Sequence, residues 1–439
     1  METMNLTGKH VAILGAGRSG RAAAMLALRE GARVSAWDAA GEEVFADMPQ
    51  EVETHPSASS EQGSKVVSDL LVVSPGIDTY GSYVAAFSAN AGEVIGEVEL
   101  AARFYQGKII GITGTNGKTT TTELVARILA HAGFGGNPCG NYGTPFAEVV
   151  LQANPPAAVS LELSSFQLET IRTLHPVVAV WLNFAPDHMD RYPTVEAYHA
   201  AKLRIFENQT GEDTAVIRTG EKLPALAAKT VTFSTTDEDA DWFSNGHAIL
   251  HNCETLLDMD HETSLRGLHN AENAMAALAA CEAIGISAAT MRAAIHGYAP
   301  PPHRCELIRT LDGVEYLNDS KATNLHALES ALRSQTRPVV LIAGGKEKGL
   351  DYSPVVPLLK QKALSAVTFG QIARPLAAMF ADAVPCEAVA TLADAVAVAR
   401  GLAPHGSTVL LSPGTSSFDQ FSGYEQRGNA FRDLVHQLR

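Results

Sequence analysis

The sequence lacks several features that would place it in a membrane-bound, secreted or nucleic-acid-binding class. No apolar run in its 439 residues approaches the ~20 residues needed to span a bilayer. The N-terminus, "METMNLTGKHVAILGAG", has no basic region followed by an apolar stretch and a small-residue cleavage site. The five cysteines form no CxxC pair, and a net charge of −15 without any Lys/Arg run argues against a nucleic-acid surface. We therefore expect a cytoplasmic protein with free thiols, no membrane insertion and no nucleic-acid partner.

Internal repeats and low-complexity segments are also missing, and 439 residues exceed what one hydrophobic core usually holds. The chain instead alternates short apolar runs with helical stretches, which is typical of α/β domains with parallel sheets. We predict three successive α/β domains: a Rossmann-like domain at residues 1–97, a central P-loop ATPase-like parallel sheet at 98–300, and a Rossmann-like domain at 301–439. The proline cluster "YAPPPHR" cannot continue a helix and marks the second boundary.

Continuous apolar runs predict strands that are covered on both faces. The clearest runs are residues 10–14, 69–77, 108–113, 157–163, 177–183, 213–219, 314–319, 338–345, 366–370 and 407–412. Helices are predicted at 21–30, 122–133, 194–208 and 268–286.

A glycine fingerprint, Gly15-x-Gly17-x-x-Gly20, follows the first strand and opens the first helix. Asp38 ends the next strand, eighteen residues beyond the fingerprint. In this context helix N-terminal amides attract a diphosphate while the acidic side chain holds a ribose hydroxyl. The pattern predicts a nucleotide-diphosphate site without identifying the nucleotide, and a purely structural glycine turn is the alternative.

The stretch "GITGTNGKTTTTE" lacks one glycine of the common phosphate-binding loop G-x-x-x-x-G-K-[ST]. The position that should be glycine is Ile112, and Gly111 comes one residue too early. The tail is intact, a strand precedes it and a helix follows. Lys118 can therefore reach the β- and γ-phosphates and the Thr119 hydroxyl can bind Mg²⁺. A structural turn without a ligand is the alternative.

Polar side chains follow two later strands of the same predicted sheet. Glu162 lies in "LELSSFQLE", and Asp187, His188 and Asp190 lie in "NFAPDHMDRY". The carboxyl ends of parallel strands face the ligand crevice, so Glu162 and His188 can converge with Thr119 around a metal. Taken singly, each is better explained as a surface residue or a helix cap. A helix lysine downstream, in "HAAKLRIFEN", has the pattern of a solvated side chain.

The last third of the chain has three polar loops after strands: "NDSKATN", "GGKEKGLDY" and "LSPGTSSFDQF". Their lysines and hydroxyls suit a carboxylate ligand, and equivalent strand ends suggest one shared site. His269, Asn270 and Asn273 open an alanine-rich helix, where they either contact an adenine edge or cap the helix. Arg304, after the prolines, lies where we expect a hinge.

Taken together, "GTNGKTT", "LELSSFQLE", "DHMDRY", "NDSKATN" and "SPGTSSFDQFSGYEQRGNAF" resemble the motifs of the Mur ligases, the ATP-dependent amide-forming enzymes of peptidoglycan precursor synthesis. The resemblance covers essentially the whole chain, and the family's loop, G-T-N-G-K-[ST]-T, explains the displaced glycine. It implies a monomer that uses ATP and Mg²⁺ to join D-glutamate to UDP-N-acetylmuramoyl-L-alanine through an acyl phosphate. The first domain would bind the UDP part, the central domain ATP and metal, and the third domain the amino acid.

The resemblance also implies roles for individual residues. Lys118, Glu162, His188 and Lys202 are implied to be catalytic. Thr119, Glu162, His188 and a carbamylated Lys202 are implied to support the metals. ATP contacts are implied for Gly114, Thr115, Asn116, Gly117, Lys118, Thr119, Thr120, Asn270, Asn273, Arg304 and Asp319. Substrate contacts are implied for Gly15, Gly17, Arg18, Ser19, Gly20, Asp38, Ser74, Asn141, Lys321, Thr323, Lys348, Ser417, Phe418 and Tyr424.

Two positions depart from the resembled pattern. Ala39 and Ala40 stand where an arginine that stacks on uracil is often found, and Tyr424 stands where phenylalanine is common. The alternatives are another ligase of the Mur/folylpolyglutamate synthase group, an NAD-dependent oxidoreductase built on the Gly15 fingerprint, and a catalytically inactive Mur-like binding subunit. A folylpolyglutamate synthase lacks the α/β domain that precedes the loop here, and an oxidoreductase leaves Lys118 without a role.

Overall fold

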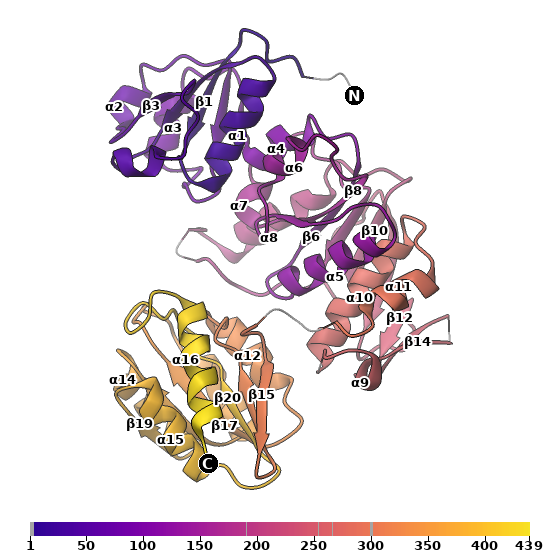
Figure 1. Ribbon diagram of the computed structural model, residues 1–439, viewed down its shortest axis with the longest axis vertical. Coiled ribbons are helices and arrows are strands. Elements are labelled where there is room, and N and C mark those ends of the chain that lie inside the picture. The colour runs from indigo at the N-terminus through magenta and orange to yellow at the C-terminus, as the bar shows by residue number, and fades with distance from the viewer. Residues whose placement is uncertain (1–3, 190, 253, 266, 299–301) are drawn as a thin grey trace. The chain divides into compact units, whose positions relative to one another are not determined.

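The structure is a computed structural model in which residues 4–189, 191–252, 254–265, 267–298 and 302–439 are described. The chain forms two compact units, the first from Met1–Glu262 with Ala271–Gly297 and the second from Thr263–Asn270 with Tyr298–Arg439 (Figure 1). The first unit contains two sheets and the second contains one, so each predicted domain range holds one sheet. The boundaries themselves stay a prediction. Asp190, Cys253 and the predicted boundary at residues 300 and 301 lie outside the described residues.

The first sheet is parallel and has the order β3-β2-β1-β4-β5. Alternate residues of its central strand enter different cores, because successive side chains of a strand point to opposite faces. Val11 and Ile13 pack with the buried face of α1, whereas Ala12 and Leu14 pack with α3. The elements are β1 (His10–Leu14), α1 (Arg18–Arg29), β2 (Arg33–Trp37), β3 (Glu53–His55), α2 (Ser60–Gly63), β4 (Leu70–Val73), α3 (Ser82–Ser88) and β5 (Val94–Gly96).

The second sheet has nine strands in the order β14-β13-β12-β11-β10-β9-β6-β8-β7. Strands β6 to β12 are parallel, and β13 and β14 extend the sheet as an antiparallel edge. The strands are β6 (Lys108–Thr113), β7 (Pro138–Gly140), β8 (Ala158–Glu162), β9 (Val178–Trp181), β10 (Thr214–Arg218), β11 (Lys229–Ser234), β12 (Trp242–Ser244), β13 (Ala248–His251) and β14 (Glu254–Asp258). The helices are α5 (Lys118–His131), α6 (Phe146–Val150), α7 (Ser165–Leu168), α8 (Val195–Leu203), α9 (Met259–Glu262), α10 (Leu268–Glu282) and α11 (Ala288–Ile295).

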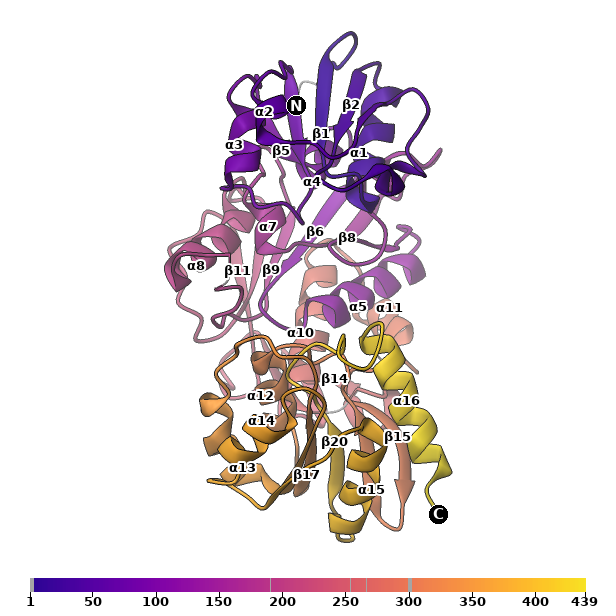
Figure 2. The ribbon, with the colours of Figure 1, turned by 90° about the vertical axis from the view of Figure 1, so that its left-hand side faces the viewer.

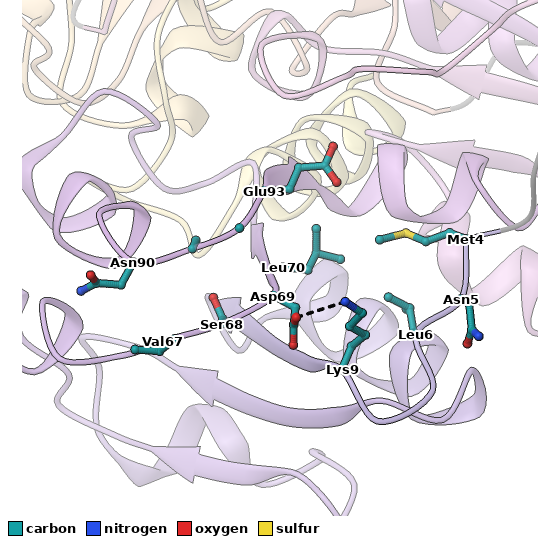
Figure 3. Close-up of a pocket in the computed structure, with 12 residues that line it drawn as sticks. Met4, Asn5, Leu6, Lys9, Val67, Ser68, Asp69, Leu70, Asn90 and Glu93 are labelled. Carbon is teal, nitrogen blue, oxygen red and sulfur yellow. Dashed lines mark hydrogen bonds and ion pairs between the residues drawn. The ribbon is translucent and has the colours of Figure 1, made fainter.

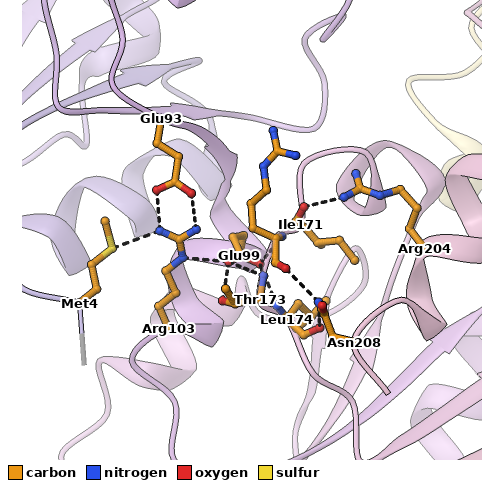
Figure 4. A network of polar contacts seen from close by, with 10 residues as sticks. Met4, Glu93, Glu99, Arg103, Ile171, Thr173, Leu174, Arg204 and Asn208 are labelled. Carbon is orange, nitrogen blue, oxygen red and sulfur yellow. Dashed lines mark hydrogen bonds and ion pairs between the residues drawn. The ribbon is translucent and has the colours of Figure 1, made fainter. Parts of the chain in front are cut away.

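Helix α4 (Glu97–Ala102) joins the two sheets of the first unit through a buried carboxylate (Figure 4). Glu99 accepts hydrogen bonds from the backbone N–H groups of Arg172, Thr173 and Leu174, each at 2.9 Å. Arg103 donates to Glu99 at 2.8 Å and forms a two-pronged pair with Glu93. Apolar residues from both sheets belong to one continuous core. The two sheets of the first unit are therefore joined by polar and apolar contacts alike.

The third sheet has the order β15-β16-β20-β17-β18-β19 and is parallel except for β15. Helices α12, α13 and α14 cover one face of this sheet, and α15 and α16 cover the other (Figure 2). In its strand β17, Leu341 and Ala343 belong to the core on the first face, and Val340 and Ile342 belong to the core on the second. The elements are β15 (Glu306–Leu311), β16 (Val314–Asn318), α12 (Leu325–Arg333), β17 (Val339–Gly344), α13 (Val356–Lys362), β18 (Ala363–Phe369), α14 (Ala373–Phe380), β19 (Cys386–Ala388), α15 (Leu392–Leu402), β20 (Thr408–Leu411) and α16 (Tyr424–Gln437).

The four cysteines among the described residues are free thiols. None of the helices in the described part of the chain combines the length and the apolar character that crossing a bilayer requires.

Candidate active site

The phosphate-loop sequence forms a tight turn between β6 and α5, which begins at Lys118. Gly117 has a φ of 84°, and a Cβ at this position would lie 2.1 Å from Asn273 Oδ1, so only glycine fits. Ile112, where the common pattern has glycine, is a buried residue of β6 that pairs with both β8 and β9. The first glycine of the loop is therefore Gly114, with a φ of 152°. The common spacing fails because the strand continues past the position at which it usually ends.

Hydrogen bonds hold this loop against the segment that follows β9. Thr115 N donates to Asn183 O at 3.0 Å, and Asn116 N donates to Asn183 Oδ1 at 2.9 Å. The Thr115 hydroxyl donates to Ala185 O at 3.1 Å. The segment then continues to Asp187. The loop and the Asp-His motif, which are some seventy residues apart, are thus neighbours at the carboxyl edge of the second sheet.

Two lysines donate to the same carbonyl oxygen of the loop. Lys118 Nζ donates to Gly114 O at 2.8 Å and to Thr115 O at 3.0 Å. Lys202 Nζ, from α8, donates to Gly114 O at 3.0 Å and lies 4.8 Å from the centre of the Tyr198 ring. Lys202 is only 2% exposed, so the expectation of a solvated helix lysine is wrong. Burial, with a further contribution from Lys118, lowers the pKa of Lys202 well below its ordinary value.

Glu162, the last residue of β8, supplies a buried carboxylate to the same edge. Its Oε1 accepts a hydrogen bond from Asn141 Nδ2 at 2.8 Å, and its backbone carbonyl accepts one from Asn141 N at 2.9 Å. Its Oε2 is buried and accepts no hydrogen bond from any residue that the structure describes. Glu162 and Asp187 both oppose the lowering of the Lys202 pKa, so they lie within electrostatic reach of that amine.

His188 is the most exposed member of this group, at 44% of its side chain. Its backbone has a φ of 58°, and its N–H donates to Asp187 Oδ1 at 2.8 Å. The imidazole lies 4.9 Å from the Phe166 ring and 5.9 Å from the Tyr198 ring, centre to centre. Helix α8 is capped by Thr194, so the alternative that the Asp-His cluster caps this helix is wrong.

A magnesium ion fits the residues predicted to hold it. A buried carboxylate oxygen without a donor, as in Glu162, is the kind of ligand that Mg²⁺ takes, and the Thr119 hydroxyl lies in the first turn of α5. Across the described ranges there is no group of three or more His, Cys, Asp or Glu side chains that could hold a metal.

The predicted adenine contacts lie on α10, within the helix. Because α10 begins at Leu268, neither Asn270 nor Asn273 is an N-cap, and that alternative is wrong. Both side chains are buried. Asn273 Oδ1 is 3.5 Å from the Thr121 hydroxyl, beside the phosphate loop, and Thr120 is buried in the same turn of α5.

The glycine fingerprint of the first sheet has the three roles that its spacing predicts. Gly15 makes the turn with a φ of 93°. A Cβ on Gly20 would lie 1.8 Å from Gly15 O, so helix and strand approach closely there. Nothing lies within 4 Å of a Cβ built on Gly17, which leaves room for a ligand at the start of α1. Ser74, after β4, places its hydroxyl 3.3 Å from Gly15 O.

Asp38 and Arg18 lie beside the Gly15 turn, and each also makes hydrogen bonds that hold a neighbouring loop. Asp38 Oδ2 accepts a hydrogen bond from Ala16 N at 2.8 Å, and its Oδ1 accepts one from Ala40 N at 2.9 Å. Arg18 Nη2 donates to Gly143 O at 3.3 Å, in the loop that contains Asn141. Ser19 is half-buried in the first turn of α1.

A cavity of about 630 Å³ opens at the other edge of this sheet, before β1, β4 and β5 (Figure 3). Lys9 and Asp69 form an ion pair of 3.2 Å on its wall. Ligands of parallel sheets bind at the carboxyl ends of the strands, so this cavity is separate from the candidate site.

In the second unit, the three polar loops meet at the carboxyl ends of the adjacent strands β16, β20 and β17. Lys321 Nζ lies 3.7 Å from the centre of the Tyr424 ring, and Lys348 Nζ is 3.5 Å from Thr323 O. Ser417 is buried, whereas Phe418 is 63% exposed. The three loops are therefore neighbours, and their expected role as one carboxylate site stays a prediction.

Asp319 follows β16 and is buried between two strand ends. Its Oδ2 accepts a hydrogen bond from the Ser412 hydroxyl at 2.9 Å, and its Oδ1 accepts one from Cys305 N at 3.2 Å. Burial raises the pKa of Asp319 to about 7, against the opposing effect of its hydrogen bonds and of Arg304. Arg304 is half-buried beside it.

Arg427 on α16 is an important residue to which the sequence analysis gave no role. It is fully buried, donates to the Ser320 hydroxyl at 3.0 Å and carbonyl at 2.9 Å, and donates to Thr415 O at 3.1 Å. It thereby ties together the loops after β16 and β20. An arginine in "YEQRGNAF" has the pattern of a helix surface, and only its place between glutamine and glycine in a long motif could have drawn attention to it.

Comparisons with known proteins agree with this geometry. Residues 112–281 match the Mur ligase middle domain, and residues 303–414 match the Mur ligase glutamate ligase domain. The UDP-N-acetylmuramoylalanine–D-glutamate ligase of Myxococcus xanthus is 42% identical over 99% of this chain and 100% of that protein. The ligase of the same name from Geotalea uraniireducens is 38% identical over 99% of both chains.

A solved structure agrees at the level of the fold. UDP-N-acetylmuramate–alanine ligase from Thermotoga maritima has a TM-score of 0.59 at 16% identity, with 98% of this chain and 99% of that chain covered. A phosphate loop, a buried carboxylate and two lysines at one sheet edge, together with these full-length similarities, show that the chain belongs to the Mur ligase family of ATP-dependent ligases.

Proposed function

We propose that this chain joins D-glutamate to UDP-N-acetylmuramoyl-L-alanine, with conversion of ATP to ADP and phosphate, as a step of peptidoglycan precursor synthesis. The proposal rests on the sequence identity of 38 to 42% to ligases named for that substrate and amino acid, which extends over nearly the whole length of this chain and of each relative. The clustering of the loop, Glu162 and Lys202 at one edge supports it. We further propose that the enzyme acts as a monomer in the cytoplasm, where ATP is available.

The proposed chemistry has two steps. An oxygen of the alanyl carboxylate attacks the γ-phosphorus of ATP, and the bond between this phosphorus and the β,γ-bridging oxygen breaks. The products of this step are an acyl phosphate and ADP. The glutamate amine then attacks the acyl carbon, releases a proton and expels phosphate as the amide forms. Negative charge accumulates in both steps, so preorganised positive groups are what the protein must supply.

The chain's own residues supply that charge at the phosphate loop. The first backbone N–H groups of a helix have no partner within the helix and favour an anion. Here those groups belong to the first turn of α5, and Lys118, the first residue of α5, adds a full positive charge. Mg²⁺, when bound, stabilises charge on the transferring phosphoryl group, with Thr119, Glu162, His188 and Lys202 as its proposed supports.

Lys202 has the environment that carbamylation needs. Its buried amine favours the neutral form, which can attack CO₂, lose a proton and become a carbamate anion. The product carries negative charge beside Glu162 and Asp187, where a bound cation would balance it. We propose that this anion supports a metal.

The second unit is proposed to hold the amino acid. Lys321 and Lys348 lie in the loops that meet at the ends of β16 and β17, and the buried Ser417 lies after β20. Lysine ammonium groups and hydroxyls are suited to the two carboxylates of glutamate. Thr323 and Tyr424 complete the proposed set.

The decisive measurement is phosphate release with ATP, Mg²⁺ and UDP-N-acetylmuramoyl-L-alanine. We expect release with D-glutamate and little with L-glutamate, L-lysine or diaminopimelate. Release that depends on a different amino acid would instead support another ligase of the Mur/folylpolyglutamate synthase group. No release with any of the four would contradict ligation.

The role of Lys202 is tested separately. Lys202→Ala should lose ligation with the fold intact, and a short carboxylic acid should restore part of it by replacing the carbamate. Lys118→Ala should lose ligation without such rescue. Lys65→Ala, an exposed lysine paired with Glu61, is the matched control and should behave as wild type. Wild-type turnover by the Lys202→Ala enzyme without added acid would contradict the carbamate proposal.

A further inference from the structure

Arg191 links the Asp-His motif to the loop that follows β4 in the first sheet. Its Nη1 donates to Pro75 O at 3.1 Å and its Nη2 donates to Ile77 O at 3.0 Å. These carbonyls lie directly after Ser74, a predicted substrate contact. Arg191 N also donates to His188 O at 3.0 Å, so its backbone is fixed one turn from the imidazole.

A second group of contacts, from Glu169, Thr79 and Phe166, holds the Arg191 guanidinium. Glu169 Oε2 lies 3.3 Å from Arg191 Nη2 and accepts a hydrogen bond from the Thr79 hydroxyl at 2.8 Å. Glu169 Oε1 accepts a hydrogen bond from the Tyr192 hydroxyl. The guanidinium carbon lies 3.9 Å from the centre of the Phe166 ring. We call Arg191, Glu169 and Thr79, with the carbonyls of Pro75 and Ile77, the Arg191 clasp.

The clasp contributes more to the position of the Ser74–Thr79 segment than to the stability of the fold. The side chains of Arg191 and Glu169 are only 12% and 1% exposed, and a buried ion pair gains little net stability because both charges lose water. A planar guanidinium with five donors can, however, reach two carbonyls, a hydroxyl and a carboxylate at once, which lysine cannot do. The segment from Ser74 to Gly81 forms neither helix nor strand. Ser74 N donates to Leu14 O of β1 at 2.9 Å, and the clasp adds side-chain hydrogen bonds to residues farther along the segment.

We propose that Arg191 is a positioning residue that holds the Ser74–Thr79 segment in register with Asp187 and His188. This inference rests on the proposed function, in which the first segment contacts the UDP substrate and the second serves phosphoryl transfer. Loss of the clasp then affects substrate binding and the chemical step together, because Arg191 belongs to the segment of Asp187 and His188 and its side chain holds the other segment. ATP binding at the loop before α5 and amino-acid binding in the second unit do not depend on it.

The test is a comparison of kinetic parameters between wild type and Arg191→Ala. We expect the KM for UDP-N-acetylmuramoyl-L-alanine to rise and kcat to fall by about tenfold each, since displacements near 1 Å can cost up to a hundredfold in rate. The KM values for ATP and D-glutamate should stay within about twofold. Arg191→Lys should show the same changes in KM and kcat as Arg191→Ala, whereas added methylguanidine should partly restore the activity of Arg191→Ala.

Arg29→Ala is the matched control. Arg29 also joins the two sheets of the first unit, since its Nη1 donates to Val150 O at 2.8 Å, but it touches neither segment. All its kinetic constants should match wild type. A purely structural role of Arg191 would reduce only the amount of active enzyme and leave every KM unchanged, and that result would overturn the proposal.

If Arg191→Ala does not fold, Thr79→Val decides the question. It removes one hydroxyl from the clasp, and we expect a two- to threefold rise in the same KM alone. An unchanged KM would overturn the proposal. Absence of turnover in the wild-type protein would count against the proposed function, whereas normal wild-type turnover with unaltered variants counts against the clasp only.

Discussion

Replacing Glu99 with alanine should destabilise the first unit more than any surface substitution. The Glu99 side chain is fully buried and is the acceptor for three backbone N–H groups, those of Arg172, Thr173 and Leu174 (Figure 4). It also accepts the Thr173 hydroxyl at 2.7 Å and pairs with Arg103. Alanine removes every one of these acceptors and leaves a cavity.

The expected loss follows from the donors left behind. An unsatisfied buried donor costs roughly 1–3 kcal/mol, and removal of one partner of a buried ion pair typically costs about 3–5 kcal/mol. Arg103 keeps its pair with Glu93, which limits the second effect. Some of the freed N–H groups will reach water through the cavity. We therefore expect Glu99→Ala to lower the free energy of unfolding by about 3–5 kcal/mol.

Tryptophan fluorescence during urea unfolding measures this loss, because Trp37, Trp181 and Trp242 all lie in the first unit. Glu61→Ala is the control: its exposed pair with Lys65 should contribute less than about 0.5 kcal/mol. A loss below about 1 kcal/mol for Glu99→Ala, with an unchanged m-value, would refute the reasoning. It would mean that water satisfies the three N–H groups as well as the carboxylate does.

The effect also has a predicted pH dependence. Burial acts to raise the pKa of Glu99, but the hydrogen bonds from Arg172, Thr173 and Arg103 outweigh it and hold the pKa below its ordinary value. The unfolded chain then takes up the proton first as the pH falls. The contribution of Glu99 is complete above about pH 4.3 and is lost as the pH falls through the folded-state pKa. The difference between wild type and Glu99→Ala should therefore narrow in acid.

Three further predictions concern other parts of the chain. Burial raises the pKa of Glu97 from 4.5 to about 7, so the protonated Glu97 side chain stabilises the fold fully below pH 4.5, and this contribution is lost as the pH rises to 7. In urea titrations, wild type should therefore lose about 3 kcal/mol of unfolding free energy between pH 4.5 and 8, relative to Glu97→Gln. Arg427→Lys should raise the KM for D-glutamate about tenfold and leave the KM for the UDP substrate unchanged, because one ammonium cannot hold both Ser320 and Thr415. Gly117→Ala should weaken ATP binding at least tenfold in calorimetry, because its Cβ would displace the Asn273 side chain.

The central strands were predictable from sequence because burial on both faces leaves a continuous apolar run. The run at residues 108–113 coincides with β6, and those at 157–163 and 177–183 contain β8 and β9. The sequence analysis missed the three-residue strands β3, β5, β7, β12 and β19, which are too short for a periodic signal; all of these except β12 lie at sheet edges. It also missed β11 and the antiparallel β13 and β14, whose exposed faces carry polar residues.

The candidate site was predictable where residues follow strands, since topology alone brings strand ends together. Glu162 and the Asp187 segment were found in this way. Side chains that reach the site from helices gave no such signal. Lys202 has the spacing of a solvated lysine, and only the family resemblance pointed to its proposed role. Arg191 and Arg427 are buried by tertiary contacts that no local pattern encodes.

In the proposed function, the two lysines that donate to Gly114 O have opposite protonation states. The proposed role of Lys118, neutralising phosphate, requires a cation, whereas the proposed carbamylation of Lys202 requires that its amine lose a proton. Lys118 is half-buried and Lys202 is 2% exposed, so desolvation penalises the charge of Lys202 far more. The charge on Lys118 then disfavours a second proton beside it. If Lys202 is carbamylated as proposed, the charge of Lys118 favours the neutral amine that this reaction needs, because both amines donate to the same carbonyl oxygen.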